Sequence, residues 1–325
     1  GALMPPDESA ASSLDAWELA RALAKPQEEL ARRRLGLSLA LRDEALADRE
    51  PLELDGLDDY GLREQALSML AGGGELDLAA WEARIAGEGR LPMRAGGRRV
   101  LGRIRDEART VLGRLERLGA RVQSGQLSLA TTASGVLIGA TVPELRQSAE
   151  GPKLCWPTAR RSVKGSALAQ MQVWVSLLVA RASGHEVERG VVVGVGDELE
   201  LGLPAGLDAQ AALGALLALR ARVRSETLLL FPKLSLELVA ARRSAKRRLE
   251  DRALVRSRRG VWEGNGMDAG DRDDPWVGAL FGHLSIDDLA DRATELLELA
   301  ESVWGPVFDA RPQRAGKGGK STEGT

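Results

Sequence analysis

The strongest local charge feature of the sequence is a basic segment over residues 242–259. This segment, RRSAKRRLEDRALVRSRR, contains nine basic and two acidic residues. Like charges on neighbouring helical turns repel one another, so the pattern is easier to understand beside an anionic surface. DNA phosphates or an acidic patch on a partner protein would provide that surface, whereas a solvated helix needs neither. The candidate DNA-binding residues in this segment are Arg247, Arg248, Arg256, Arg258 and Arg259.

Three other segments resemble ligand-binding motifs but lack a required residue. GKGGKST near the C-terminus is similar to a phosphate-binding loop, but Arg314 stands where that loop needs its first glycine. GVVVGVGDELELG has the glycine spacing of a dinucleotide turn, yet it continues into strand-like sequence. The acidic loop DAGDRDDPW lacks the glycine and terminal glutamate of a calcium loop. We therefore expect no cofactor and no metal ion.

Tryptophan and arginine side chains offer surfaces on which nucleic-acid bases stack. Trp156 and Trp174 fall in a strand and an apolar helix, which predicts core positions. Trp262 and Trp276 flank the acidic loop and are the better candidates for an exposed contact. The chain contains 38 arginines and seven lysines, an excess that a GC-rich genome also explains.

Composition limits the remaining function classes. The 325 residues are 44% hydrophobic and carry a net charge of −2, so DNA contact must come from local patches. One cysteine and two histidines leave no disulfide framework and no multi-cysteine zinc site. No apolar run reaches the ~20 residues of a membrane span. We expect a soluble protein of a reducing compartment.

The chain begins with helical periodicity and changes to alternating residues after Gly119. Ser12 and Asp15 fit a capping box before a helix that Pro26 interrupts. Alternating small and β-branched residues around Ser134-Gly135 predict a hairpin. Before Gly119 we expect an extended piece at 51–57 and helices over 59–71, 76–87 and 98–119. After it we expect strands over 127–132, 135–142 and 153–157 in one mixed sheet, with a helix over 164–183 packed against it. A hairpin turning near Gly196-Asp197, a helix over 208–225 and a strand in TLLLFP follow, and the chain ends in helices after Leu234, with a loop at 260–275 and a capping box at Ser285 and Asp288.

Several of these segments, in this order, resemble a known family. SSLDAWELARALAKPQEELARRRLGLSL resembles the first helix of RecB- and AddB-type nuclease domains. ADREPLELDGLDDYGLREQALSML, GVLIGATVPEL and DDPWVGALFGHLSIDDLADRATELLELAESVWGPVFDA are similar to the C-terminal domain of RecC, a subunit of bacterial exodeoxyribonuclease V. The resemblance extends in order from about residue 14 to 310.

The resemblance implies an α/β fold, an inactivated PD-(D/E)xK nuclease-like mixed sheet flanked by helices, with additional helical segments at both ends. It divides the chain into one domain over 12–310, with a helical first part at 12–96, an α/β core at 97–232 and C-terminal helices at 233–310. A disordered head at 1–11 and tail at 311–325 flank this domain. The implied partners are RecB-like and RecD-like helicase subunits and a DNA fork or duplex end, in the bacterial cytoplasm. Near the fork the family places Arg32, Arg33 and Arg34.

An active domain of this type holds Mg²⁺ with an Asp on its second strand and a carboxylate-x-Lys on its third. The matching positions here are degenerate. The second strand has Thr141 and Val142, and Glu144 falls after Pro143, where the strand is expected to leave the site. The third strand has Cys155, Trp156 and Thr158. We therefore expect no nuclease activity.

Three functions remain open at this stage. The first is a non-catalytic domain that handles a DNA junction and assembles subunits of a RecBCD-type helicase–nuclease in recombinational repair. The second is an active metal-dependent exonuclease with an unusual site. The third is a protein–protein scaffold without DNA contact. The missing carboxylates separate the first function from the second, whereas the sequence does not separate the first from the third.

Overall fold

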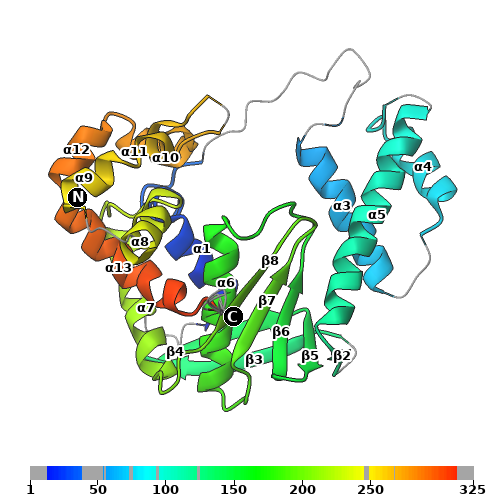
Figure 1. The fold of residues 1–325 in the computed structure, drawn as a ribbon, viewed down its shortest axis with the longest axis horizontal. Helices are drawn as coiled ribbons and strands as arrows, with labels where there is room; N and C mark the ends of the chain where they lie inside the picture. The colour runs from blue at the N-terminus through cyan, green and yellow to red at the C-terminus, as the bar shows by residue number, and fades with distance from the viewer. Residues whose placement is uncertain are drawn as a thin grey trace, which may run out of the picture.

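The computed structural model describes residues 13–38, 54, 56–72, 76–92, 95–122, 125–244, 249–266 and 268–312. These residues form two mixed β-sheets flanked by helices (Figure 1), which confirms the expected α/β class. No helix in this part of the chain is long and apolar enough to cross a membrane.

The smaller sheet has three strands in the order β1-β4-β3. Strands β3 (Leu127–Ala133) and β4 (Val136–Val142) form the predicted antiparallel hairpin. Its turn residues, Ser134 and Gly135, both have positive φ, at 48° and 77°, which is the conformation of a tight hairpin turn. The hairpin is therefore confirmed.

The helix expected to begin at Ser12 begins later. Residues Ser13–Asp15 form strand β1, which pairs parallel to β4 and buries Leu14. Helix α1 (Ala16–Ala24) follows, and the carboxylate of Asp15 accepts the N–H of Trp17 at 2.7 Å. Asp15 is thus the N-cap itself, and its pairing with Gly139 of β4 excludes an earlier helix start.

The larger sheet has five strands, in the order β2 (Ala120–Arg121), β5 (Glu144–Ser148), β6 (Gly151–Pro157), β7 (Arg189–Val193) and β8 (Glu198–Gly202). The hairpin of β7 and β8 is confirmed. The expectation that the strands at 127–142 and 153–157 share one sheet is wrong. Pro143 lacks an N–H and separates β4 from β5, so the chain leaves one sheet there and enters the other.

Helices cover both faces of the larger sheet. Helix α6 (Ala167–Ala182) packs on the face that carries Leu154 and Trp156, as predicted for this apolar helix. Helix α5 (Ala95–Arg117) packs on the other face, against Cys155. The approach of α6 is close, since a Cβ on Gly190 of β7 would lie 2.6 Å from a methyl group of Val173.

The remaining helices of the first two thirds of the chain lie beside these layers. Helices α3 (Gly56–Ala71) and α4 (Leu78–Gly87) pack with α5 on the side of β2 and β5 (Figure 1). Helices α2 (Pro26–Arg33) and α7 (Ala209–Ser225) pack with α1 on the other side. The helices predicted over 59–71, 76–87, 98–119 and 208–225 are therefore confirmed. Of the extended piece expected at 51–57, residues 51–53 and 55 lie outside the described part, and Gly56 begins α3.

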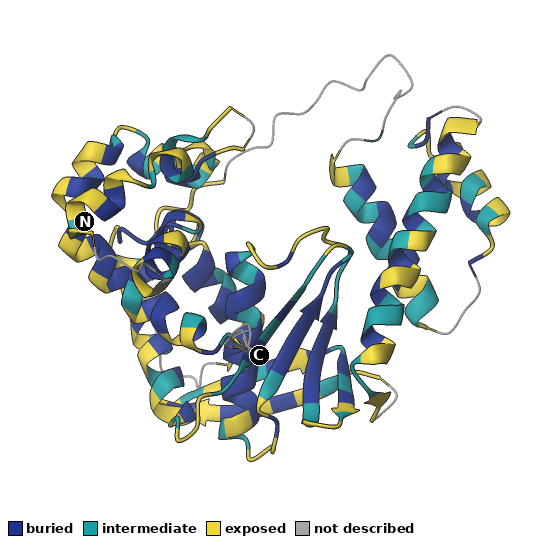
Figure 2. Cartoon of the chain, viewed as in Figure 1, coloured by how far each residue is buried: buried dark blue, intermediate teal, exposed yellow. Residues whose placement is uncertain are grey.

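The C-terminal helices form a separate buried core (Figure 2). Phe231 is at its centre, with ring centroids 4.8 Å from Trp262 and 5.3 Å from Phe281. The exposed position expected for Trp262 is wrong, because this side chain is fully buried and donates to the carbonyl of Leu284. The helices are α8 (Leu234–Ser244), α9 (Asp251–Arg256), α10 (Arg259–Glu263), α11 (Pro275–Phe281), α12 (Ile286–Asp291) and α13 (Ala293–Asp309), with a 3-10 turn η1 (Asp271–Asp273).

Two further expectations in this region differ from the structure, and one is confirmed. TLLLFP is not a strand, because side chains bind its backbone groups where a neighbouring strand would do so. Gln27 donates to the carbonyl of Leu230, and the hydroxyl of Ser235 accepts the N–H of Phe231. Arg311, expected in a disordered tail, donates to Gln170 at 2.6 Å. The capping box at the start of α12 is confirmed.

Candidate nucleic-acid interface

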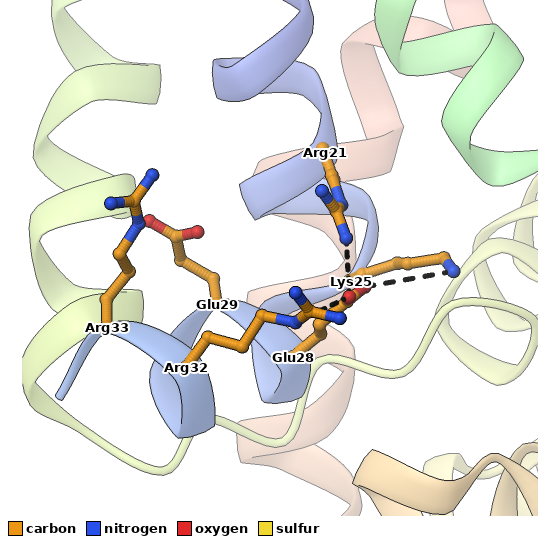
Figure 3. Close-up of a pocket in the computed structure, with 6 residues that line it drawn as sticks. All are labelled: Arg21, Lys25, Glu28, Glu29, Arg32 and Arg33. Carbon is orange, nitrogen blue, oxygen red and sulfur yellow. Dashed lines mark hydrogen bonds and ion pairs between the residues drawn. The ribbon is translucent and has the colours of Figure 1, made fainter. Parts of the chain in front are cut away.

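A cluster of charged side chains lies where α1 meets α2 (Figure 3). The chain turns at Lys25, and Pro26 then occupies the first position of α2, where its missing N–H costs nothing. The turn brings the last residues of α1 beside the first turns of α2, around a cavity of about 280 Å³. We call the residues that line it the α1–α2 cluster: Arg21, Lys25, Glu28, Glu29, Arg32 and Arg33.

The buried carboxylate of Glu28 is the centre of this cluster. One of its oxygens lies 2.5 Å from Arg21 and 3.0 Å from Arg32, and the other lies 3.8 Å from Lys25. Glu28 is only 6% exposed, whereas the three cations are more open to solvent. Because three cations share one negative charge, a net positive charge remains at the surface.

The second glutamate fixes the cluster to the rest of the fold. Glu29 lies 2.7 Å from Arg224 and 3.9 Å from Arg220, both on α7. Arg33 lies 4.0 Å from Glu18 of α1, and Arg34 follows α2 with an exposed side chain. The predicted site at Arg32 to Arg34 is thus on the surface, and it is joined by two cations, Arg21 and Lys25, that were not predicted.

Two tryptophans flank the cluster. The guanidinium of Arg32 lies 5.3 Å from the ring centroid of Trp276, and that of Arg21 lies 5.3 Å from the ring of Trp17. Trp17 is 41% exposed, whereas Trp276, for which an exposed position was expected, is only partly exposed. Cations interleaved with exposed aromatic rings are typical of surfaces that bind a nucleic-acid strand.

The second predicted basic site, residues 242–259, is not one helix. Helix α8 ends at Ser244 and α9 begins at Asp251, while Arg247 and Arg248 lie outside the described residues. Arg256 and Arg259 pair with Asp287 of α12, at 2.7 and 3.1 Å. Acidic side chains of this same chain therefore already match the charge of these two arginines, and their contact with DNA stays a prediction.

The degenerate positions on the second strand, Thr141 and Val142, carry no ionisable side chain. Val142 is fully buried in the core beneath α6, and Thr141 is exposed. After Pro143 the chain enters the larger sheet, and Glu144 is the first residue there. It begins β5 opposite Cys155 and pairs with Arg146 at 2.8 Å, with 4% of its surface exposed. This carboxylate is therefore neutralised within the sheet.

The degenerate positions on the third strand are occupied by packing and by a hydrogen bond. Cys155 is buried against α5, and burial raises the pKa of its thiol to about 12. Trp156 faces α6. Thr158, at the end of β6, donates to Glu64 of α3 at 3.3 Å.

A charged network at the same end of the sheet was not predicted. Asp59 of α3 accepts from Arg63 at 2.5 Å and from Arg103 of α5 at 2.6 Å, and Arg161 lies 3.5 Å away. Burial alone would raise the pKa of Asp59, but the hydrogen bond from Arg103 and the charges of Arg63 and Arg103 lower it below its usual value. Glu107 also contacts Arg63 and Arg103. Among the described residues no three His, Cys, Asp or Glu side chains are grouped to hold a metal ion.

The arrangement defines the class of the protein as a mixed α/β domain whose two sheets are covered by helices, with a basic, aromatic-flanked cluster on its surface. The chain belongs to the RecC C-terminal domain family, whose model matches residues 11–243. No curated protein matches the chain in sequence.

A comparison of folds adds little to this assignment. The crystal structure of SSO0001 is 15% identical in sequence to the chain. The match covers 52% of this chain and 87% of that one, with a TM-score of 0.26. That score is too low for SSO0001 to support a functional argument.

Proposed function

We propose that this domain handles a DNA junction and assembles subunits of a RecBCD-type helicase–nuclease, and that it does not itself cut DNA. Family membership supports a place in such a complex. The proposed partners are RecB-like and RecD-like subunits and a DNA fork, in the bacterial cytoplasm, during repair of double-strand breaks by recombination.

The observation that best supports DNA contact is the net positive charge around Glu28. Arg21, Lys25 and Arg32 converge on this one carboxylate, so two positive charges remain unmatched by it. Phosphates attract such surfaces and release counterions on binding, which makes the affinity depend on salt. The rings of Trp17 and Trp276 beside the cations add stacking surface for unpaired bases at a fork.

The positions that match a nuclease site support a non-catalytic domain. A metal-dependent nuclease needs carboxylate ligands and a lysine that orients water. Here Val142 and Trp156 fill the core, and Thr158 is held by Glu64. A second carboxylate at this end of the sheet, that of Asp59, is bound by three arginines, which compete with any cation for its oxygens.

The test is binding of a forked duplex by the purified chain, followed across salt concentrations. A double change, Lys25→Gln with Arg32→Gln, leaves the 2.5 Å pair of Arg21 and Glu28 intact, so the fold is expected to persist. We expect weaker binding and a slope of log affinity against log salt that is lower by about two units. The control is Arg292→Gln, which removes an exposed arginine paired with Glu295 and is expected to change neither quantity.

Two outcomes would contradict the proposal. Absence of measurable binding to the fork by the unaltered chain would leave a protein–protein scaffold. Mg²⁺-dependent degradation of the fork that disappears on a point change in this chain would show an active nuclease.

A further inference from the structure

A second, larger cavity lies among the C-terminal helices. Its volume is about 640 Å³, and its wall combines α8, α10, the turn before α6 and the residues after α13. It shares no residue with the α1–α2 cluster. The charged side chains that line it are Lys164, Lys233, Glu237, Arg258, Asp268 and Arg311.

The cations of this cavity differ from most basic residues of the fold in their lack of ion pairs. Within the described ranges, no carboxylate oxygen lies within 4 Å of the side-chain nitrogens of Lys164, Lys233, Arg258 or Arg311. In the α1–α2 cluster, by contrast, every cation has a glutamate within that distance. Four cations and two carboxylates, Glu237 and Asp268, line the cavity, so its wall keeps a net positive charge that favours an anion.

The hydrogen bonds of these cations leave donors unused. Lys233 donates its ammonium to the carbonyl of Ala269 at 2.6 Å, and Arg311 donates to Gln170 at 2.6 Å. The Nε atoms of Arg258 and Arg311 are buried and have no hydrogen-bond partner among the described residues. A buried donor without a partner costs free energy, and an anionic oxygen is the acceptor that a guanidinium binds best.

The nearby helix terminus does not supply this positive charge. The N–H groups of Lys233 and Leu234, at the start of α8, donate to the carboxylate of Asp271 at 2.6–3.1 Å. The charge of the cavity therefore comes from side chains that reach it from four separate segments.

We propose that this cavity binds a phosphate-bearing nucleotide, as the 5′-terminal nucleotide of a DNA strand or as a free mononucleotide. Its volume lies in the range of small-ligand sites, roughly 300–1,000 Å³. The four cations match the phosphate, and Leu236 and Val261 offer apolar surface to a base. Glu237 and Asp268 accept the N–H and O–H donors that a base and a sugar carry.

The test compares three probes by titration against the whole chain: a short single-stranded oligonucleotide with a 5′-phosphate, the same oligonucleotide with a 5′-hydroxyl, and deoxyadenosine monophosphate. We expect the 5′-phosphate to improve binding about tenfold, because the cations form charge-assisted hydrogen bonds to its oxygens. Binding of the mononucleotide alone, without a preference between the two oligonucleotides, would assign the site to a free nucleotide.

Variants show whether the phosphate preference or the mononucleotide binding arises from this cavity. Lys164→Gln with Arg258→Gln is expected to remove the preference for phosphate and to weaken mononucleotide binding about tenfold. The control matched in charge is Arg252→Gln with Arg292→Gln, which changes two exposed arginines that pair with Asp291 and Glu295. If the double variant folds poorly, Lys164→Gln alone decides, because its exposed side chain makes no hydrogen bond to a described residue.

The proposal is overturned if neither a phosphate preference nor mononucleotide binding appears, or if either survives the loss of Lys164 and Arg258. The outcome is separable from that of the fork-binding proposal. The Lys25→Gln, Arg32→Gln chain is expected to keep its preference for the 5′-phosphate while it loses affinity for the fork.

Discussion

The carboxylate of Glu64 on α3 accepts the backbone N–H of Ala159, 3.0 Å away, directly after strand β6. The same oxygen accepts the hydroxyl of Tyr60 at 2.9 Å and that of Thr158 at 3.3 Å. Arg63 of the same helix donates to the carbonyl of Ala159 at 2.7 Å. Helix α3 is therefore fixed to the end of the larger sheet that carries Thr158.

The first prediction concerns this attachment. Glu64→Ala leaves the N–H of Ala159 and the hydroxyl of Tyr60 without their acceptor, which is expected to cost about 2–3 kcal/mol of unfolding free energy. Glu64→Gln keeps one acceptor oxygen and is expected to cost less than about 1 kcal/mol. Urea unfolding of both variants measures the difference. Equal losses would show that the charge of Glu64, and not its hydrogen bonds, attaches the helix.

The second prediction concerns Glu28. Glu28→Gln removes the charge that three cations share, so those cations repel one another. Since their side chains are 36–54% exposed, solvent screens part of this effect, and we expect a loss of about 1–3 kcal/mol in unfolding free energy. The control Glu226→Gln breaks an exposed pair with Arg222 and is expected to cost less than about 0.5 kcal/mol.

Glu28→Gln also tests DNA contact, because it is expected to raise the affinity that removal of the cations lowers. Because the variant adds one positive charge to the α1–α2 cluster, affinity for forked DNA is expected to rise even as stability falls. Lower affinity in a folded variant would mean that Glu28 positions the cations and that their geometry matters more than their net charge.

Local patterns predicted the elements that depend on neighbouring residues. The turn at Ser134-Gly135 requires positive φ, and the capping box at Ser285 and Asp288 uses side chains three residues apart, so both were visible in the sequence. The error at Ser12 arose because helix propensity cannot show that residues 13–15 pair with a strand more than 120 residues later.

In the candidate site, too, spacing along one helix predicts pairs within that helix but not contacts between helices. Arg63 and Asp59, and Arg103 and Glu107, are each spaced four residues apart, which predicts two pairs on two helices. That the four meet in one network depends on the packing of α3 against α5, which no local pattern contains. Likewise, the basic run at Arg32 was visible in the sequence. The contacts of Arg21 and Lys25 with Glu28 depend on the turn at Pro26, which brings α1 and α2 together.

The third prediction concerns the chain's one thiol. Burial raises the pKa of Cys155 to about 12, so the reactive thiolate is scarce at pH 8 and the side chain is closed to reagents. We expect no reaction with a thiol reagent under native conditions and one equivalent of reaction in urea. Rapid native reaction would mean that α5 opens from the sheet, since Cys155 packs beneath it.

The fourth prediction is a pH dependence that arises from Asp271. Burial raises the pKa of this carboxyl from 3.8 to about 6, although the N–H groups of Leu234 and Lys233 lower it in part. Because the folded chain holds the proton more tightly than the unfolded chain, this stabilisation is complete below pH about 4 and is lost as the pH rises through about 6.

Asp271→Asn removes this titration and keeps an oxygen to accept the N–H of Leu234. Between pH 4.5 and 7 the unaltered chain is expected to lose about 2 kcal/mol more unfolding free energy than the variant does. The comparison uses urea unfolding at both pH values, so groups that titrate in both proteins cancel. Parallel pH profiles would show that the carboxyl of Asp271 keeps its ordinary pKa in the fold.

The fifth prediction concerns Arg247 and Arg248, which lie outside the described residues between α8 and α9. On either side of them, the structure pairs the basic side chains with acids of the C-terminal helices: Arg243 contacts Glu301 and Asp309, and Arg252 contacts Asp291. Changing Arg247 and Arg248 therefore tests whether this segment contacts DNA in addition to the α1–α2 cluster.

We expect Arg247→Ala with Arg248→Ala to weaken binding of forked DNA and to lower the salt slope by about two units, with little change in thermal stability. The matched control, Arg252→Ala with Arg292→Ala, removes the same charge from arginines that are already paired, and is expected to leave the slope nearly unchanged. If both double variants lower the slope equally, the effect reflects overall charge and not a contact. If neither does, Arg247 and Arg248 make no contact with the fork, and the salt dependence of fork binding comes from Arg21, Lys25 and Arg32 of the α1–α2 cluster.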